Sequence, residues 1–191
     1  MPVVTALRSE RRGRVAVELD GSPWRLLPSE VVVRTGLATG LSLDRPRLRL
    51  LRRELRRAEA LGVATNALRH RDLSSQSVAE RLARAGVAPA AQAESLATLS
   101  RAGLVDDERF CRNRASALAE RGFGDEGIRH DLGGRGMPGE LVEAALGELE
   151  PEAERARRIV DGRGSGPKTA RYLAGKGFGE DAVEIAFAPD P

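Results

Sequence analysis

Three copies of one short pattern constrain the fold more than any other feature of the sequence. Each copy has a leucine, a glycine four residues later, an apolar residue directly after that glycine, and another apolar residue fourteen places after the leucine. Glycine after an apolar helical stripe is a typical helix end, so each copy predicts a helix, a tight turn and a second helix. The copies are Leu82, Gly86, Val87 and Leu96; Leu132, Gly136, Met137 and Leu146; and Leu173, Gly177, Phe178 and Phe187.

The middle copy lies in the stretch from Arg121 to Leu149, which is predicted to form two short helices. Ile128 and Leu132 are four residues apart and therefore share one helix face. Gly136 and the proline two residues after it are predicted to end the first helix and begin the second. The repetition of this unit predicts three related helical modules.

Composition supports a helical protein without disulfides. Hydrophobic residues make up 41% of the 191 residues but aromatics only 3%, so the core consists of Leu, Val and Ala, which suits small packed helices. Cys111 is the single cysteine, which excludes an internal disulfide and fits a reducing compartment. No apolar run reaches the length of a signal peptide or a membrane span, so a soluble, cytoplasmic protein is expected.

The first forty-odd residues have a different pattern. Apolar and polar residues alternate over 15–19 and again over 24–26, which is the strand period. Asp20-Gly21 between them is a turn signal, so a hairpin is predicted, with Pro23 in or beside the turn. Residues 31–33 fit either a third strand or a short helix. This part is predicted to be a small β-containing lobe.

A basic helix is predicted next, capped by Asp44 and running to about Leu61 before Gly62. From Arg45 to Arg71 there are nine arginines and two glutamates, a local net charge of +7. The helix is either a solvated linker or a basic rod that meets phosphates or an acidic protein face. Its predicted apolar stripe is Leu48, Leu51, Leu55 and Ala58, and the arginines Arg49, Arg52, Arg53, Arg56 and Arg57 crowd the remaining surface.

Glycine and proline punctuate the rest of the chain into short helices. The predicted helices span about 66–71; a segment capped by Ser74 or Ser75 and ending at Gly86; Pro89 to Gly103; a segment from its cap Asp106 to Arg121; the pair joined at Gly136; Pro151 to about Asp161; and two short segments starting near Pro167 and Glu180. A loop is expected at 162–166 and a disordered tail at 189–191.

No motif in the sequence argues for an enzyme. Residues 162–169 nearly match the phosphate-binding GxxxxGK[ST] pattern, but Pro167 stands where a glycine N–H donor is needed, so a loop before a helix is predicted. His70 and His130 have no second ligand at helical spacing. Asp106-Asp107 suits the start of a helix better than a catalytic acid pair. No cofactor and no metal are expected.

Arg135 and Lys176 occupy the same repeat position, directly before the glycine. Two interpretations remain open: cations in the last turn of a helix stabilise it through the macrodipole, or stacked modules line these cations along one binding groove. Arg129 and Arg171 would join such a groove. Because few aromatic residues are available to stack bases, independent binding of nucleic acid is expected to be weak and salt-sensitive.

Four segments resemble the RecX family, the regulatory proteins that act on the recombinase RecA. Together they cover roughly residues 64 to 187, in family order. One departure is Gly127, which stands where a basic or polar helix former is expected. The segments are Ala67-Leu68-Arg69-His70-Arg71 with Ser74; Leu104-Val105-Asp106-Asp107-Glu108-Arg109-Phe110; Arg121-Gly-Phe-Gly followed by Ile128, Arg129, Leu132, Arg135, Gly136 and Met137; and Leu173 with Lys176, Gly177 and Phe178.

The resemblance implies a mainly α fold, an elongated array of three three-helix, helix-turn-helix-like repeats. It also implies a negative regulator of recombination, DNA repair and the SOS response. Such a protein binds RecA filaments on single-stranded DNA in the filament groove, inhibits ATP hydrolysis and strand exchange, and favours disassembly. A monomer is expected. The residues predicted to contact RecA or DNA are Arg71, Arg109, Arg129, Arg135, Arg171 and Lys176, with Arg49, Arg53 and Arg56 of the basic helix.

Two other functions remain open at this point. Helix pairs joined at glycine also fit a tandem helix-turn-helix-like regulator that binds duplex DNA, and a scaffold without a nucleic-acid role is the third interpretation. The predicted organisation is a β-containing lobe at 1–43, a basic linker helix at 44–62, and helical repeats at 63–103, 104–150 and 151–188.

Overall fold

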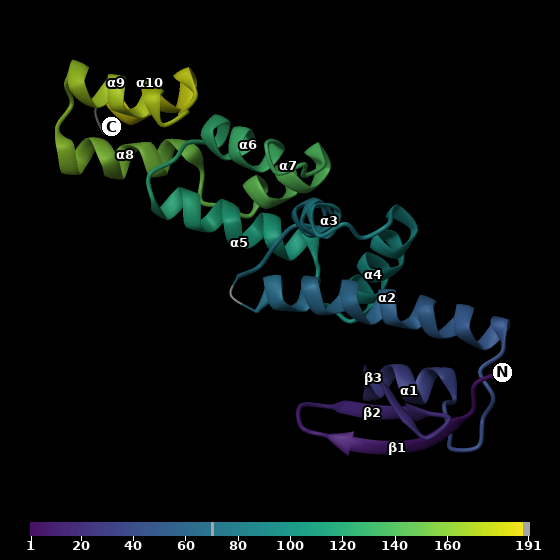
Figure 1. The fold of residues 1–191 in the computed structure, drawn as a ribbon. Helices are drawn as coiled ribbons and strands as arrows, with labels where there is room; N and C mark the ends of the chain where they lie inside the picture. Colours follow the sequence, from purple (N-terminus) through teal and green to yellow (C-terminus); the bar gives the residue numbers. More distant parts are fainter. Residues whose placement is uncertain (70, 189–191) are drawn as a thin grey trace. The chain divides into compact units, whose positions relative to one another are not determined.

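The computed structural model describes residues 1–69 and 71–188 (Figure 1). The expectations for His70 and for the 189–191 tail lie outside the described residues. The chain divides into two compact units, the first formed by Met1–Arg71 with Val78–Ala102 and the second by Asp72–Ser77 with Gly103–Pro191.

The N-terminal lobe contains a three-stranded antiparallel sheet in the order β1-β2-β3 (β1 Val4–Glu10, β2 Arg14–Leu19, β3 Ser22–Pro28). The predicted hairpin of β2 and β3 is confirmed. Asp20 and Gly21 have φ of 48° and 79°, the positive values that a two-residue hairpin turn requires. Strand β1 was not predicted, because its sequence VTALRSE lacks a regular alternation of apolar and polar residues.

Residues 31–33, which fit either a strand or a helix by sequence, belong to helix α1 (Ser29–Thr35). Val31 is 1% exposed and packs in a core with Val17, Leu27 and Leu51. The sheet and α1 therefore form one hydrophobic core with the first half of the next helix.

Helix α2 (Arg45–Leu68) begins as predicted, with the Asp44 side chain accepting a hydrogen bond from the amide of Arg47 at 2.8 Å. The predicted end before Gly62 is wrong, and so is the separate helix at 66–71, because α2 continues through Gly62 to Leu68. Ala60 and Ala64, both 0% exposed, lie on either side of Gly62 and carry the buried face past it. A buried face on both sides outweighs the cost of ~1 kcal/mol for a helical glycine.

The rest of the described chain is a repeated helical array, as predicted. Ser74 is the cap of the first helix of this part, since its Oγ accepts a hydrogen bond from the amide of Ser77 at 3.2 Å. One predicted boundary moves, because the helix expected to end near Asp161 continues to Arg163. The helices are α3 (Ser75–Arg84), α4 (Pro89–Arg101), α5 (Asp107–Glu120), α6 (Asp125–Gly133), α7 (Gly139–Gly147), α8 (Glu152–Arg163), α9 (Pro167–Gly175) and α10 (Glu180–Phe187).

The three copies of the sequence repeat have the same backbone structure. Their leucines, Leu82, Leu132 and Leu173, are all 0% exposed. The glycines four residues later have φ of 75°, 72° and 77°, the left-handed conformation that glycine adopts without strain. The amide after each glycine donates to the carbonyl of the leucine at 3.0, 3.2 and 3.1 Å. This is the Schellman helix end, which explains the leucine-glycine spacing.

Separate hydrophobic cores hold α5–α7 and α8–α10 together, and the two helix groups meet through glycines. The amide of Gly124 donates to the carbonyl of Lys176, and that of Glu126 to the carbonyl of Gly177, both at 3.0 Å. A Cβ on Gly127 would lie 2.5 Å from the carbonyl oxygen of Lys176. The departure noted at Gly127 is therefore a requirement of backbone-to-backbone packing.

Candidate nucleic-acid interface

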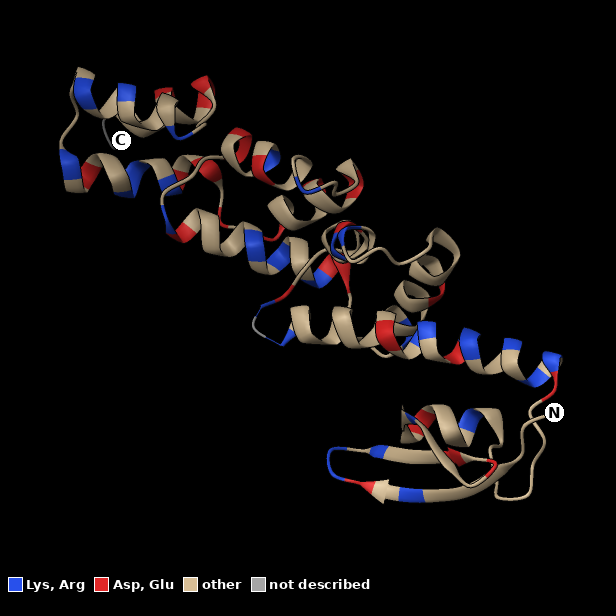
Figure 2. Ribbon diagram, viewed as in Figure 1, with Lys and Arg blue, Asp and Glu red and all other residues tan. Residues whose placement is uncertain are grey.

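Basic residues gather on the first half of α2 (Figure 2). Arg49, Arg53 and Arg56, all predicted to bind RecA or DNA, are exposed there. Within the described chain Arg49 and Arg56 form no ion pair, while Arg53 lies 3.3 Å from the Glu54 carboxylate. The opposite face of α2 is buried in the lobe, so the helix is held with its arginines toward solvent.

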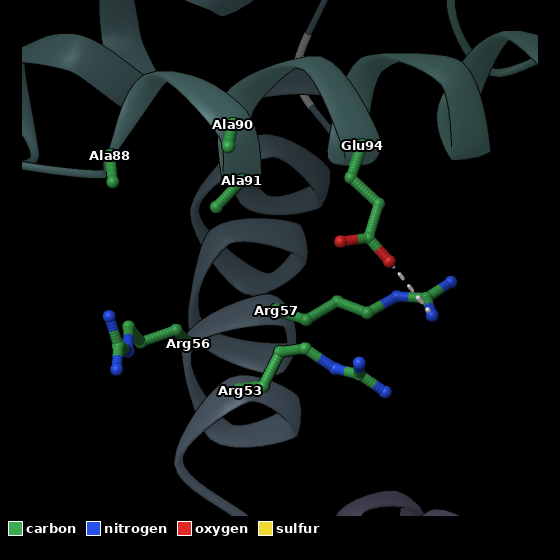
Figure 3. Close-up of a pocket in the computed structure, with 7 residues that line it drawn as sticks. All are labelled: Arg53, Arg56, Arg57, Ala88, Ala90, Ala91 and Glu94. Carbon is green, nitrogen blue, oxygen red and sulfur yellow. Dashed lines mark ion pairs between the residues drawn. The ribbon is translucent and has the colours of Figure 1, made fainter. Parts of the chain in front are cut away.

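A pocket of about 270 Å³ lies between α2 and the start of α4, entirely within the first unit (Figure 3). Arg57 Nη1 pairs with Glu94 Oε1 at 3.2 Å, and its Nε is buried with no hydrogen-bond partner among the described residues. The ion pair links α4 to α2. The pocket is lined by Arg53, Arg56, Arg57, Ala88, Ala90, Ala91 and Glu94.

Arg129, on α6, is bound on two sides by carboxylates. Its guanidinium donates to Glu143 of α7 at 2.7 and 3.0 Å and to Glu126 at 2.8 Å. These contacts raise the pKa of Arg129, chiefly through the hydrogen bond to Glu143, and they lower the pKa of Glu143. Most of the charge of Arg129 is therefore compensated within the protein.

Arg135, which follows α6, shares a carboxylate with a residue that the sequence did not single out. Asp131 accepts from Arg135 at 2.8 and 3.2 Å and from Arg114 of α5 at 2.8 Å through both oxygens. The two guanidinium groups, Arg114 above all, hold the pKa of Asp131 well below its usual range. One carboxylate between two arginines leaves a net positive charge at this point, with the Arg135 side chain 39% exposed.

Lys176, at the equivalent repeat position, lies against aromatic rings. Its Nζ is 4.0 Å from the ring centre of Phe123 and 5.9 Å from that of Tyr172. A cation over an aromatic face is worth ~0.5–1 kcal/mol at exposed sites. Arg135 and Lys176 thus have different partners in the two repeats despite their common sequence position.

The other three predicted residues are exposed to different degrees. Arg71 follows α2 and is exposed, and Arg171 on α9 is exposed beside Phe178 and Val183 in a surface hollow. Arg109 donates through Nη1 to the carbonyl of Gly103 at 3.0 Å. Of the nine predicted contact residues, five have no carboxylate partner in the described part of the chain: Arg49, Arg56, Arg71, Arg171 and Lys176, the last of which lies over aromatic rings. The assignment of all nine stays a prediction.

Two further charged residues have structural roles that sequence reasoning did not predict. Arg155 is 5% exposed and donates to the carbonyls of Glu150 and Phe123 at 2.9 and 3.0 Å, and it also pairs with Asp125. Asp107 accepts from the amide of Ser75 at 2.8 Å and so caps α3 besides beginning α5. Nothing in the sequence pattern signals a contact between residues 32 positions apart.

Among the described residues no group of three or more His, Cys, Asp or Glu side chains is placed to hold a metal ion. In the same residues no helix is both long enough and apolar enough to cross a bilayer.

The fold and its surfaces define a class: a protein of repeated three-helix units with a small N-terminal β lobe and exposed arginines. Comparison with known proteins identifies a family with the same three-helix units. A family model described as "RecX, second three-helix domain" matches residues 106–146, which cover α5, α6 and nearly all of α7. The chain belongs to the RecX family of regulatory proteins.

Two relatives illustrate the similarity. The regulatory protein RecX of Stenotrophomonas maltophilia (strain R551-3) is 32% identical over 138 residues, which cover 67% of this chain and 85% of the relative. That of Chromohalobacter salexigens is 35% identical over 134 residues, covering 65% of this chain and 88% of the relative.

Solved structures extend the fold comparison to the N-terminal lobe. A crystal structure of regulatory protein RecX has a TM-score of 0.83 at 19% identity and covers 97% of this chain and 98% of its own. RecX from Lactobacillus salivarius has a TM-score of 0.62 at 16% identity, covering 69% of this chain and 94% of its own. The β lobe is therefore part of a fold that at least one solved structure shares.

Proposed function

We propose that this protein is a negative regulator of RecA that binds RecA filaments on single-stranded DNA in the filament groove. Bound there, it inhibits ATP hydrolysis and strand exchange and favours filament disassembly. The observation that carries the proposal is membership of the RecX family, at 32% identity over 138 residues to a protein named as a regulatory protein.

The charge distribution supports the same function. The proposed binding places arginines against DNA phosphates and acidic RecA side chains, and arginines that are not already paired are best suited to such contacts. The exposed face of α2 offers such arginines in Arg49 and Arg56, and the second unit offers Arg171. Binding of this kind acts by steric and electrostatic means and needs no catalytic residues.

The test is RecA's ATP hydrolysis on single-stranded DNA, titrated with this protein at two salt concentrations. Inhibition that weakens at the higher salt is expected, because contacts with phosphates release counterions. Absence of inhibition at micromolar excess, with a folded sample and the cognate RecA, contradicts the proposal. Tight, sequence-dependent binding to duplex DNA without RecA would instead identify a helix-turn-helix-like DNA-binding regulator.

A further inference from the structure

The outer face of the N-terminal sheet carries an exposed tryptophan. On β2 the side chains of Val15 and Val17 are buried in the core, while Ala16 and Glu18, which follow them in turn, belong to the opposite face. On β3 Trp24 is 38% exposed and Leu26 is 49% exposed. A hollow of about 400 Å³ on this face is lined by Arg8, Ala16, Val17, Glu18, Pro23, Trp24, Arg25 and Leu26.

A β-bulge places Trp24 in this hollow. Val17 pairs with Arg25 and Glu18 pairs with Pro23, which leaves Trp24 as the extra residue on β3. Bulges of this kind redirect a side chain and are frequent beside functional sites. Because Pro23 has no N–H, this end of the β3 edge is also poorly suited to pairing with an added strand. A ligand is therefore expected on the face of the sheet and not along its edge.

Trp24 is the aromatic ring that the fold leaves available. It is the chain's one tryptophan, and all the other aromatic residues, one tyrosine and four phenylalanines, have partners in the helical units. Phe110 and Phe178 are buried; Phe123 and Tyr172 lie under the cations of Lys176 and Arg163; and Phe187 packs against the core of α8–α10.

Arginines lie in the hollow and at the turn between β1 and β2. Arg8 and Arg25 line the hollow, and Arg11, Arg12 and Arg14 lie at the turn between β1 and β2, which is blue in Figure 2. Glu18, the carboxylate in the hollow, is paired with Arg8 at 3.1 Å. The other four arginines have no ion pair within the described residues. The hollow thus combines an exposed ring with uncompensated positive charge.

We propose that this face binds single-stranded nucleic acid, with one base stacked on Trp24 and the neighbouring phosphates held by the arginines of the hollow and the turn. Arg14 lies four residues along β2 from Glu18, about 13 Å at the usual rise per residue, so a short segment of nucleic acid reaches from the ring to the arginines of the β1–β2 turn. Ala16 lies between Arg14 and Glu18, and its small side chain leaves room for the nucleic acid. Stacking on a ring tolerates any base, so binding depends little on sequence. The inference goes beyond the proposed function, because it requires no RecA.

The intrinsic fluorescence of Trp24 reports on the proposed contact directly, since no other tryptophan contributes. The full-length protein is titrated with a dT12 oligonucleotide at low and at moderate salt. Quenching that saturates, and an affinity that falls with salt, are expected. A duplex of the same length should quench less, because its bases are already stacked. No quenching at tens of micromolar dT12 in low salt overturns the inference.

Variants assign the binding to this face, with the anisotropy of labelled dT12 as the readout. Trp24→Ala is expected to weaken binding about tenfold, the effect of losing one stacked base, and Trp24→Phe to retain most of it. Val33→Ala is the matched control, since Val33 is an exposed apolar residue of the same lobe, at 79% exposure. Circular dichroism checks that the variants are folded. Equal binding by Trp24→Ala and the wild type overturns the inference.

Three further outcomes separate this inference from binding of a protein and from the proposed function. If RecA alone changes the emission of Trp24 while dT12 does not, the face binds protein and the inference is wrong. If RecA's ATP hydrolysis is inhibited by the wild type and dT12 still gives no quenching, the proposed function stands and this inference fails. If dT12 quenches the emission of Trp24 but the protein has no effect on RecA's ATP hydrolysis, this inference stands and the proposed function fails.

Discussion

The Cβ that Gly127 lacks would lie 2.5 Å from the carbonyl oxygen of Lys176, so the second and third repeats meet backbone to backbone. Gly177 has the reciprocal constraint, since its own Cβ would lie 2.3 Å from the amide nitrogen of Gly127. The segments in contact are Arg121-Gly-Phe-Gly and Lys176-Gly-Phe-Gly, which differ only in their first residue. In the third copy of the repeat, Gly177 therefore both ends a helix and builds the junction between the second and third repeats.

Substitution of Gly127 by alanine is expected to destabilise the protein, although alanine is the better helix former. Overpacking against a backbone carbonyl costs ~1–3 kcal/mol, which exceeds the ~1 kcal/mol gained in helix propensity. Gly133→Ala is the matched control, because Gly133 ends the same helix and a Cβ there would have no other atom within 4 Å. Urea unfolding should show a lower midpoint for the first variant and an unchanged or higher one for the control. Equal midpoints would contradict the packing argument.

The helical array was predictable from the sequence because each element carries its own local signal. Asp44 and Asp106 cap α2 and α5 as predicted, and Gly136 adopts the left-handed turn. Gly62 was misread as a helix end, because a glycine ends a helix only where the chain leaves the helical conformation. The buried alanines on either side of Gly62, which keep the helix going, are a tertiary effect.

The candidate site was less predictable than the fold, because sequence gives the positions of charges but not their partners. Arg135 and Lys176 occupy one repeat position, yet the first pairs with Asp131 and the second lies over Phe123. Trp24 was recognised as a strand residue, but its exposure depends on the bulge in β3, which no local pattern signals.

The carboxylate of Asp131 is expected to make part of the stability depend on acid pH. Its folded pKa is lowered by Arg114 and Arg135, so its contribution is fully present above the unfolded value of about 3.9 and is lost as pH falls below 4 toward the folded pKa. The Asp131→Asn variant should be less stable than the wild type at pH 7, by on the order of 2 kcal/mol, and should lose less stability between pH 4 and pH 2.

Thermal unfolding at several pH values measures this effect. Glu143→Gln is the comparison, since Glu143 also pairs with an arginine but its side chain is 58% exposed. Its effect at pH 7 should stay within about 0.5 kcal/mol. If the stability of Asp131→Asn falls as steeply below pH 4 as that of the wild type, Asp131 is not the group responsible.

The unpaired arginines of α2 are expected to contribute to binding of the RecA filament, and this prediction depends on the proposed function. Replacing Arg49 and Arg56 together by glutamine should lower affinity and reduce the slope of log affinity against log salt by about 0.7 for each phosphate that is no longer bound. Arg112→Gln is the control, because Arg112 is already paired with Glu108 at 2.9 Å. Affinities measured by ATPase inhibition at several salt concentrations give both quantities. An unchanged slope would remove α2 from the interface.

Cys111 provides a probe of how the second repeat opens. The thiol is 0% exposed in the α5–α7 core, and burial, with a smaller effect from Asp107, raises its pKa. Because the thiolate is the reactive species, DTNB at pH 8 should label the native protein at least ~100-fold more slowly than the urea-unfolded protein.

A Cys111→Ala, Ser116→Cys variant is the control. It places the thiol on the exposed face of the same helix and should react at nearly the unfolded rate. Rapid labelling of native Cys111 would mean that this core opens far more often than its packing implies. If Cys111 is labelled faster in Gly127→Ala than in Gly133→Ala, the substitution at Gly127 also destabilises the α5–α7 core, and Gly127 belongs to the same cooperative unit as Cys111.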